Sequence, residues 1–483
     1  MPTDPRGLRS DAPLLDAWLR FHEQAPTPFT IPGHKQRHDL VGDVVAGDVP
    51  LYAGLDTMKL SRGVLAEAEA RAARLWGADT CRFSVGGATH ANQALALALA
   101  DTSYAPAGSG ASQNGTVVVS RTLHRSMLLG LVLAGLDPVW VRPEVDPTTG
   151  LPLGVAAGTV AEALRRHPGT RAVLVGDPSY VGTVGDVAAL ADTAHAHGVP
   201  LVVDAAWAAH FGFHPDLPRH ALHLGADAMV ASAHKTLPSW SQAALVLVRG
   251  SRIDPARLDA AVEATHTTSP AGAILASIDA ARALLERDGK SLLGEVLCAV
   301  RAVRDRLVDI DGLMVLDGPG VDPLKLTLVL PGTGADGIAV EADLLAAGLP
   351  VEAAERDTIV AQVSLADTAA SLERLAAALA ASVARHRGTP RPVATGAAYQ
   401  VDPVTVMPPR EAFFAPSIPV PLRDAVGRTS VELVAPYPPG IPVLAPGEEV
   451  TDAVLDALRK ARSDGVRIAY AADPSLETLR VMR

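Results

Sequence analysis

Short apolar runs rich in β-branched residues alternate with helix-forming segments between residues 80 and 250. We expect strands at 81–85, 116–120, 139–141, 172–175, 201–204, 228–231 and 243–248. Most of these runs are apolar throughout, which is typical of strands that are covered on both faces. Helices between such strands produce a mostly parallel sheet with helices on both sides. The sequence therefore predicts an α/β large domain.

The chain is too long for one hydrophobic core. At 483 residues, its length alone suggests about two to four domains. We expect an N-terminal arm at 1–50 with a short helix at 13–22, a large domain at 51–300, a small α+β domain at 301–388 and a C-terminal domain at 389–483. A long helix at about 294–308 is expected to lead into the small domain. The small domain is predicted from strands at 313–316, 324–330 and 358–363 and helices at 340–347 and 369–385. The C-terminal domain is proline-rich with a helix at 452–463, and residues 386–392 are the expected linker.

Composition restricts the partners and the compartment. The net charge is -11 and no block of Lys or Arg is present, so we expect a small-molecule ligand and no nucleic acid. Cys81 and Cys298 are too few for a disulfide framework, which favours a reducing cytoplasm. No apolar segment has the length of a membrane span, and no zinc-type spacing is present, so we expect neither a membrane nor a metal.

Two residues at the ends of expected strands indicate a particular chemistry. Asp204 closes the strand at 201–204, and Lys235 follows the strand at 228–231 in a polar run. A carboxylate at the end of an apolar strand is costly unless it is paired. A lysine for the aldehyde and an acid against the ring nitrogen are two things that pyridoxal 5′-phosphate needs from a protein. The alternatives are that Asp204 caps the next turn and that Lys235 is a surface cation.

The same cofactor needs phosphate donors and a group on the ring face. The turn at 86–89 joins a strand to a helix, so its backbone N–H groups and the helix N-terminus suit a phosphate. His124 comes just after the strand at 116–120, where it can stack on a ring or move protons. Both features have structural alternatives, because glycine turns and lone histidines are common outside active sites.

At these residues the chain resembles the Orn/Lys/Arg decarboxylase family of fold-type I pyridoxal-phosphate enzymes. The likeness is to short bacterial members that lack an N-terminal receiver-like domain. It is carried by residues 32–35, 86–93, 121–126, 177–180, 204–210, 232–235, 267–270, 276–279, 322–326, 411–414 and 436–442. The resemblance implies an aspartate-aminotransferase-like large domain with a mostly parallel sheet, plus smaller α+β C-terminal domains. It also implies a homodimer or higher homo-oligomer with shared active sites.

The resemblance further implies roles for individual residues. The implied catalytic residues are Lys235, which forms the Schiff base with pyridoxal 5′-phosphate, Asp204 at the pyridine nitrogen and His124 over the ring. The full expected cofactor-binding set is Gly87, Ala88, Thr89, His124, Asp204, Trp207, Ser232, His234, Lys235, Thr268 and Ser269. In it, Ala88, Thr89, Ser232 and His234 are implied to bind the phosphate. Thr268 and Ser269 are implied to reach the cofactor of a neighbouring subunit.

The implied activity is decarboxylation of a basic amino acid, arginine, lysine or ornithine, giving a polyamine or diamine. The proton that replaces CO₂ comes from Lys235 or His234. The distal cation of the substrate needs an acid, for which the candidates are Glu432, Asp56 and Glu411.

Other chemistry at the α-carbon, such as transamination, is an alternative, and a weakly active regulatory homologue is another. The second alternative rests on departures from the family pattern. Ala205 and Trp207 stand where members usually carry a carboxylate and a histidine, and the stretch at 57–62 is altered. A further departure is Ala88, which stands where a serine is frequent.

Overall fold

The computed structural model describes residues 3–25, 29–49, 63–100, 115–393, 396, 399, 401–437, 441–463 and 466–483. Asp56 and residues 57–62, which the sequence analysis singled out, lie outside these ranges. Within the described ranges, no helix has both the length and the apolar character needed to cross a membrane.

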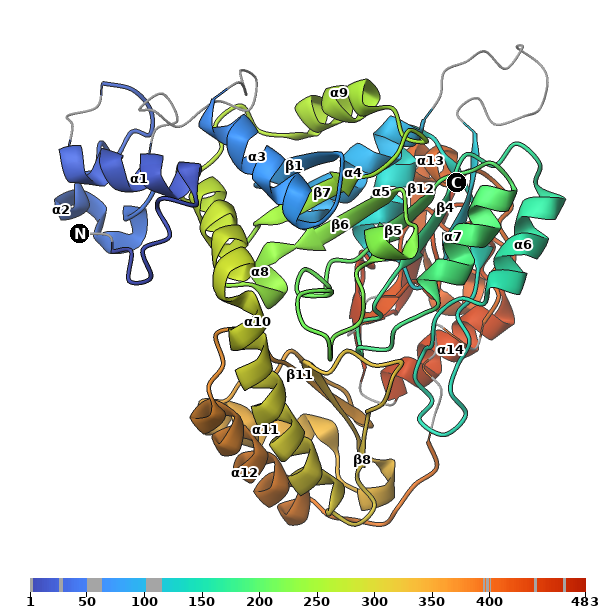
Figure 1. Ribbon diagram of the computed structural model, residues 1–483. Helices are drawn as coiled ribbons and strands as arrows, with labels where there is room; N and C mark the ends of the chain where they lie inside the picture. The colour runs from blue at the N-terminus through green and yellow to red at the C-terminus, as the bar shows by residue number, and fades with distance from the viewer. Residues whose placement is uncertain are drawn as a thin grey trace.

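A seven-stranded sheet lies at the centre of the largest unit (Figure 1). Its strand order is β1-β7-β6-β5-β4-β2-β3. The strand β7 is antiparallel to both of its neighbours, and the other adjacent pairs are parallel. The strands are β1 (Thr80–Ser84), β2 (Thr116–Ser120), β3 (Asp137–Val141), β4 (Val173–Gly176), β5 (Leu201–Asp204), β6 (Ala228–Ser232) and β7 (Ala244–Val248).

Side chains of these strands alternate between two hydrophobic cores. In β6, Met229 and Ala231 belong to one core, and Ala228 and Val230 belong to the other. Because successive side chains of a strand point to opposite faces, the two cores lie on opposite sides of the sheet. Burial on both sides explains why the strands are apolar at nearly every position.

Helices cover both faces of the sheet. The first core includes α3 (Val64–Leu75), α6 (Ala157–Arg166), α7 (Val187–Ala196) and α10 (Gly272–Val308). The second includes α4 (Gly87–Leu99), α5 (Arg125–Ala134) and α9 (Pro255–Thr265). The short helix α8 (Ala233–Thr236) follows β6 directly and carries Lys235.

A smaller unit packs at the C-terminal end of α10 (Figure 1). Its antiparallel sheet has the order β10-β11-β9-β8. The elements are β8 (Met314–Val315), β9 (Lys325–Val329), β10 (Ala353–Ala354), β11 (Thr358–Gln362), α11 (Gly337–Ala346) and α12 (Ala369–Arg385). The helix α10 begins well before the predicted position near residue 294 and crosses residue 300, so the large and small units share it.

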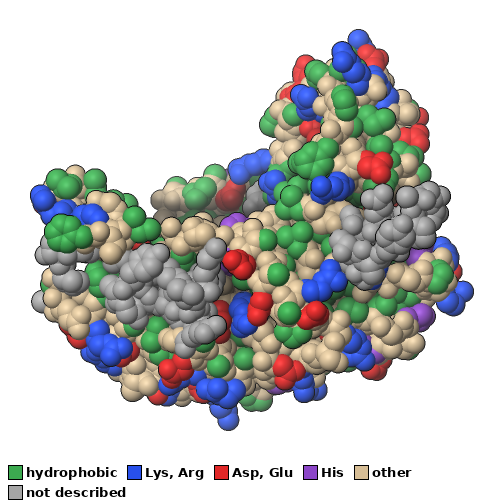
Figure 2. All heavy atoms as spheres, turned by 90° about the horizontal axis from the view of Figure 1, so that it is seen from above, with side chains coloured by type: hydrophobic (Ala, Val, Ile, Leu, Met, Phe, Trp, Pro, Cys, Tyr) green, Lys and Arg blue, Asp and Glu red, His purple; other side chains and the backbone are tan. Residues whose placement is uncertain are grey.

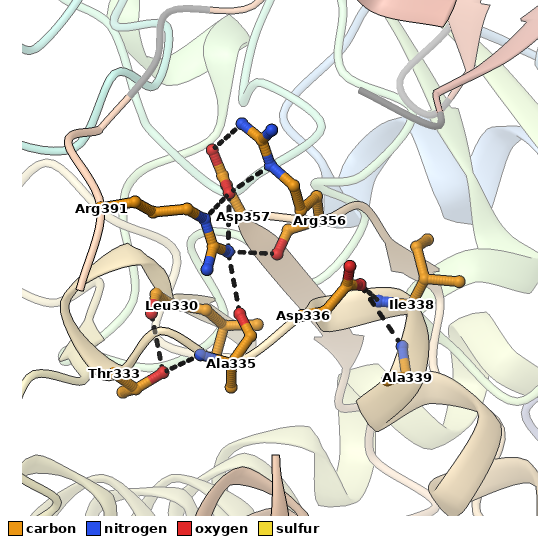
Figure 3. Close-up of polar contacts among 9 residues, drawn as sticks. All are labelled: Leu330, Thr333, Ala335, Asp336, Ile338, Ala339, Arg356, Asp357 and Arg391. Carbon is orange, nitrogen blue, oxygen red and sulfur yellow. Dashed lines mark hydrogen bonds and ion pairs between the residues drawn. The ribbon is translucent and has the colours of Figure 1, made fainter. Parts of the chain in front are cut away.

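The segment after α12 is held against the small unit. Arg391 donates from Nε to Asp357 at 2.7 Å, and its Nη2 donates to the carbonyl oxygens of Ala335 and Arg356, each at 2.8 Å (Figure 3). Arg356 bonds the same carboxylate through its Nε at 3.0 Å. The end of the expected linker at 386–392 therefore has a defined place on this unit.

The C-terminal part has its own apolar core. It contains α13 (Pro409–Phe414), α14 (Asp452–Ser463) and two antiparallel ribbons, which pair β12 (Ser417–Pro421) with β15 (Thr478–Met482) and β13 (Ala435–Tyr437) with β14 (Arg467–Ala469). A buried ion pair between Arg121, just after β2, and Glu448 joins this part to the large unit. Arg121 Nη2 lies 2.9 Å from Glu448 Oε2, and Arg121 Nε donates to the carbonyl of Pro442 at 3.1 Å.

The N-terminal arm is anchored at α1 (Pro13–Gln24), and α2 (His38–Val41) follows it. The amide of Leu14 donates to Asp279 Oδ2 on α10 at 2.9 Å, and Arg71 on α3 donates to the carbonyl of Asp11 at 2.7 Å. On the face seen from above in Figure 2, Lys and Arg side chains are interspersed with Asp and Glu side chains. Cys81 is buried, Cys298 is exposed, and both are free thiols.

Candidate active site

A cavity of about 560 Å³ lies at the carboxyl ends of the parallel strands. Its walls include Gly176 at the end of β4, Asp204 at the end of β5 and Ser232 at the end of β6. Open α/β sheets bind ligands at this edge, because the strand ends and the following loops converge there. The small unit contributes Glu352, and the C-terminal part contributes Ile441. The cavity is therefore built from all three parts of the molecule.

Asp204 is buried at the end of β5, and its carboxylate is fixed by two donors. Asn92 on α4 donates from Nδ2 to Asp204 Oδ2 at 2.7 Å, and the amide of Ala206 donates to Asp204 Oδ1 at 3.2 Å. Asn92 also donates to Ser126 Oγ on α5 at 3.0 Å. These bonds hold a negative charge against the cavity wall. The bond from the amide of Ala206 is the turn cap of the alternative interpretation, and Asp204 makes it while also lining the cavity.

Lys235 also lines the cavity, and its Nζ lies 3.9 Å from the ring centre of Trp207. Burial lowers the pKa of the Lys235 ammonium, and the charges of Asp204 and Glu352 oppose that shift. A lowered pKa increases the share of neutral amine, which is the nucleophilic form. Lys235 is therefore not the surface cation of the alternative interpretation.

His124 borders the cavity at the N-terminus of α5. Its Nδ1 accepts from the amide of Ser126 at 3.2 Å, so a neutral His124 carries its proton on Nε2. Desolvation lowers the pKa of His124, with Lys235 and Arg125 adding to the shift and Asp204 opposing it. A neutral ring with its apolar faces free of charge suits stacking.

The turn before α4 faces the same cavity. Gly87, Ala88 and Thr89 form the first turn of this helix, where backbone N–H groups lack acceptors within the helix. The φ angle of Gly87 is 69°, and its amide donates to the carbonyl of Gln242 at 2.7 Å, which needs glycine at this place. The aligned peptide dipoles add partial positive charge here.

Hydroxyls beside Lys235 lack partners in the described structure. Ser232 Oγ and Thr236 Oγ1 are buried without a hydrogen bond among the described residues. An unpaired buried hydroxyl is costly, so at Ser232, which lines the cavity, a ligand that supplies the missing bond is favoured. His234 lies between them, and its Nδ1 donates to the carbonyl of Ala243 at 2.8 Å. Burial lowers the pKa of His234.

Other predicted residues lie away from the cavity of this chain. Thr268 and Ser269 are exposed between α9 and α10 and do not line it. Glu432 is buried in the C-terminal part, where its two oxygens accept from the amides of Ala472 at 2.6 Å and Arg480 at 2.7 Å. Glu411 is exposed on α13. Among the acids suggested for a distal cation, neither of these two described ones lines the cavity.

Four residues at or near the cavity had no role in the sequence-based expectations, although the first three lie in segments that carry the resemblance: Asn92, Tyr180, Lys325 and Glu352. Tyr180 packs edge to face on Trp207, with ring centres 5.4 Å apart, and its Oη donates to Glu352 Oε1 at 3.0 Å. Lys325 is buried at the start of β9 with Nζ 3.3 Å from the ring centre of Trp207. For Asn92 a signal existed, because an amide on the buried side of an alanine-rich helix needs a partner.

The sheet and the site together define a class of protein. A seven-stranded sheet in which β7 alone opposes its neighbours, an aspartate ending β5 and a lysine after β6 are the arrangement of fold-type I enzymes of the aspartate-aminotransferase type. Members of this class depend on pyridoxal phosphate. Within the described residues, no group of three or more His, Cys, Asp or Glu side chains is placed to hold a metal ion.

Comparison with known proteins narrows the class to a family. The family model described as Orn/Lys/Arg decarboxylase, major domain, matches residues 12–319, and the model of its C-terminal domain matches residues 393–465. The chain therefore belongs to the Orn/Lys/Arg decarboxylase family. An arginine decarboxylase of Halalkalibacterium halodurans is 30% identical to it, with 98% of each protein covered. An arginine decarboxylase of Bacillus subtilis is 29% identical to it, again with 98% of each protein covered.

Solved structures show the same fold. A Francisella novicida lysine decarboxylase has a TM-score of 0.81 and 20% sequence identity, and the match covers 98% of this chain and 81% of that one. The expected family, the expected fold class and the expected enzyme class, a decarboxylase, are confirmed.

Two of the residues that depart from the family pattern lie at or near the site. Ala205 is buried, and Trp207 forms part of the cavity wall beside Lys235.

Proposed function

We propose that this protein is a pyridoxal-phosphate-dependent decarboxylase of a basic amino acid, with arginine as the first candidate substrate and lysine and ornithine as the others. The observation that carries the proposal is the placement of Lys235 and Asp204 on one cavity. Relatives of the same length named arginine decarboxylases support arginine. Family membership counts against transamination.

The residues present fit the cofactor. The unpaired hydroxyl of Ser232 lies on the wall of a cavity that also contains the first turn of α4. Lys235 would hold the aldehyde, Asp204 the ring nitrogen and His124 the ring face. The phosphate would be held by Ala88, Thr89, Ser232 and a protonated His234, with Gly87 shaping the turn and Trp207 completing the wall. When bound, the cofactor supplies an electron sink for the pair that the departing carboxylate leaves behind.

The chain's own residues supply positioning and proton transfer. The carboxylate of Asp204 is held in place by Asn92, so it can keep a facing ring nitrogen protonated. His234 donates from Nδ1 to a backbone carbonyl, which leaves Nε2 as an acceptor in the neutral ring and as the phosphate donor in the protonated ring. Of the two proton donors considered for the α-carbon, Lys235 is therefore the favoured one.

We further propose a homodimer or higher homo-oligomer in the cytoplasm, with domain boundaries near residues 50, 300 and 388. The exposed positions of Thr268 and Ser269 support a role toward a neighbouring subunit, because both lie off the cavity of their own chain. The two free thiols support a reducing compartment.

The test is release of CO₂ from arginine, lysine and ornithine by the purified protein loaded with pyridoxal phosphate. We expect release from at least one of the three, with the matching amine as product. The Lys235→Ala variant should fall to the background of the assay, because no other amine replaces the nucleophile. Equal release by the variant and the wild type would refute the proposal.

A further inference from the structure

The cavity contains a second carboxylate with no role in the mechanism above. Among the described residues that line it, the acids are Asp204 and Glu352. The carboxylate of Asp204 already accepts hydrogen bonds from the side chain of Asn92 and from the amide of Ala206. Glu352 comes from the small unit, in the segment between α11 and β10, and it is exposed on the cavity.

Glu352 is held in place from the large unit. Tyr180 donates to its Oε1 at 3.0 Å and packs against Trp207, whose ring lies 3.9 Å from Lys235 Nζ. The carboxylate thus belongs to the same packed group as the expected cofactor lysine. Its negative charge also acts on the two nearby lysines. It raises the pKa of Lys235 and of Lys325, although burial lowers both pKa values by more.

A basic amino acid carries two groups that the cavity must recognise separately. Its α-amino group has to reach Lys235, and its distal cation then needs an anion elsewhere on the wall. Glu432 uses both oxygens on backbone amides, and Glu411 does not line the cavity. We propose that Glu352 is the specificity-determining residue that receives the distal ammonium or guanidinium group of the substrate. This inference rests on the proposed decarboxylase function.

A purely structural role for Glu352 is the competing explanation, since its bond to Tyr180 joins the small unit to the large unit. Two variants separate the explanations. Glu352→Gln removes the charge but keeps an oxygen that can accept from Tyr180. Tyr180→Phe removes the hydrogen bond but keeps the charge. Glu341→Gln, on α11 and not among the lining residues, is the matched control for charge loss in the same unit.

We expect Glu352→Gln to raise the KM of the preferred substrate by about 10- to 100-fold, the usual value of one charge-assisted hydrogen bond. The kcat should change by much less, and the inhibition constant of the product amine should rise in parallel with KM. Discrimination between arginine and the neutral citrulline, or between lysine and norleucine, should fall by a similar factor. Tyr180→Phe should have a clearly smaller effect on KM, and Glu341→Gln should have none.

The inference is overturned if Glu352→Gln keeps the wild-type KM and product inhibition, or if Tyr180→Phe raises KM as much as Glu352→Gln does. Melting temperatures of all variants show whether folding is affected. If the wild type releases CO₂ but the variants give either of these two contradicting results, only the role of Glu352 is refuted. If the wild type releases no CO₂ from any of the three amino acids, the proposed function fails first, and the inference fails with it.

Discussion

Lys325 is a fully buried lysine at the start of β9 whose Nζ lacks a hydrogen bond among the described residues. Its ammonium lies on the ring of Trp207, 3.3 Å from the ring centre, and 5.5 Å from that of Tyr180. Cation–π contact offsets part of the cost of burying the charge. Desolvation nevertheless lowers its pKa to about 7, while Asp322 and Glu352 oppose the shift.

Lys325→Met should raise the melting temperature at neutral pH and below. The unfolded lysine keeps its proton up to about pH 10.5, whereas the folded one loses it near pH 7. The wild type therefore gains stability as the pH rises from about 7 to 10.5, because its unfolded state binds more protons in that range. The advantage of the variant should shrink over the same range. The measurement is the difference in melting temperature between variant and wild type at several pH values.

The control is Lys290→Met, at an exposed position on α10, which should show no such dependence on pH. A Lys325→Met advantage that stays constant from pH 6 to pH 10 would mean that Lys325 is charged throughout in the folded protein.

Part of the site could be predicted residue by residue. Asp204 and Lys235 stood out because polar side chains at strand ends break an apolar pattern, and the structure places both on the cavity. Tyr180 lies in a segment that resembles the family, but no pattern around Tyr180 or Glu352 gave either of them a role. Their place depends on how the small unit packs on the large one, and no local spacing encodes that contact.

At the scale of elements, α4 and α5 together position the Asp204 carboxylate. Asn92 on α4 bonds Asp204 and also Ser126 on α5. The two helices approach closely at Gly130 of α5, where an added Cβ would lie 3.0 Å from Ala96 Cβ and 3.3 Å from Gln93 Cα. Glycine at this position permits the close packing.

Gly130→Val should destabilise the protein by about 1–3 kcal/mol, because extra atoms between closely packed helices force them apart. The control is Gly158→Val on α6, where an added Cβ meets nothing within 4 Å. Both changes introduce the same β-branched residue into a helix, so the difference between their unfolding free energies in urea reports the packing. Equal losses in the two variants would argue against the tight α4–α5 contact.

The pattern of elements was more predictable than their lengths. The helices at 369–385 and 452–463 begin and end as expected, since each shows one apolar stripe. The first half of α10 was missed, because residues such as Ile274, Leu275 and Ile278 are buried on several sides and leave no one-sided stripe. In the sequence, Gly289 also indicates a possible end of a helix, although it lies inside α10.

At the scale of the whole molecule, three units close around one cavity. The helix α10 runs from the large unit into the small one (Figure 1). The buried pair of Arg121 and Glu448 fixes the C-terminal part beside the strand ends, near the cavity residue Ile441. The site is thus a product of the assembled fold. Its central feature is a pair of lysines, Lys235 and Lys325, beside one indole ring.

The most direct test asks which of these lysines binds the cofactor. The protein is incubated with pyridoxal phosphate, reduced with borohydride and digested, and the labelled peptide is identified by mass spectrometry. The account predicts a label on Lys235, no label on Lys325 and loss of the label in Lys235→Ala. A label on Lys325, or on any other lysine with Lys235 unmodified, would contradict it.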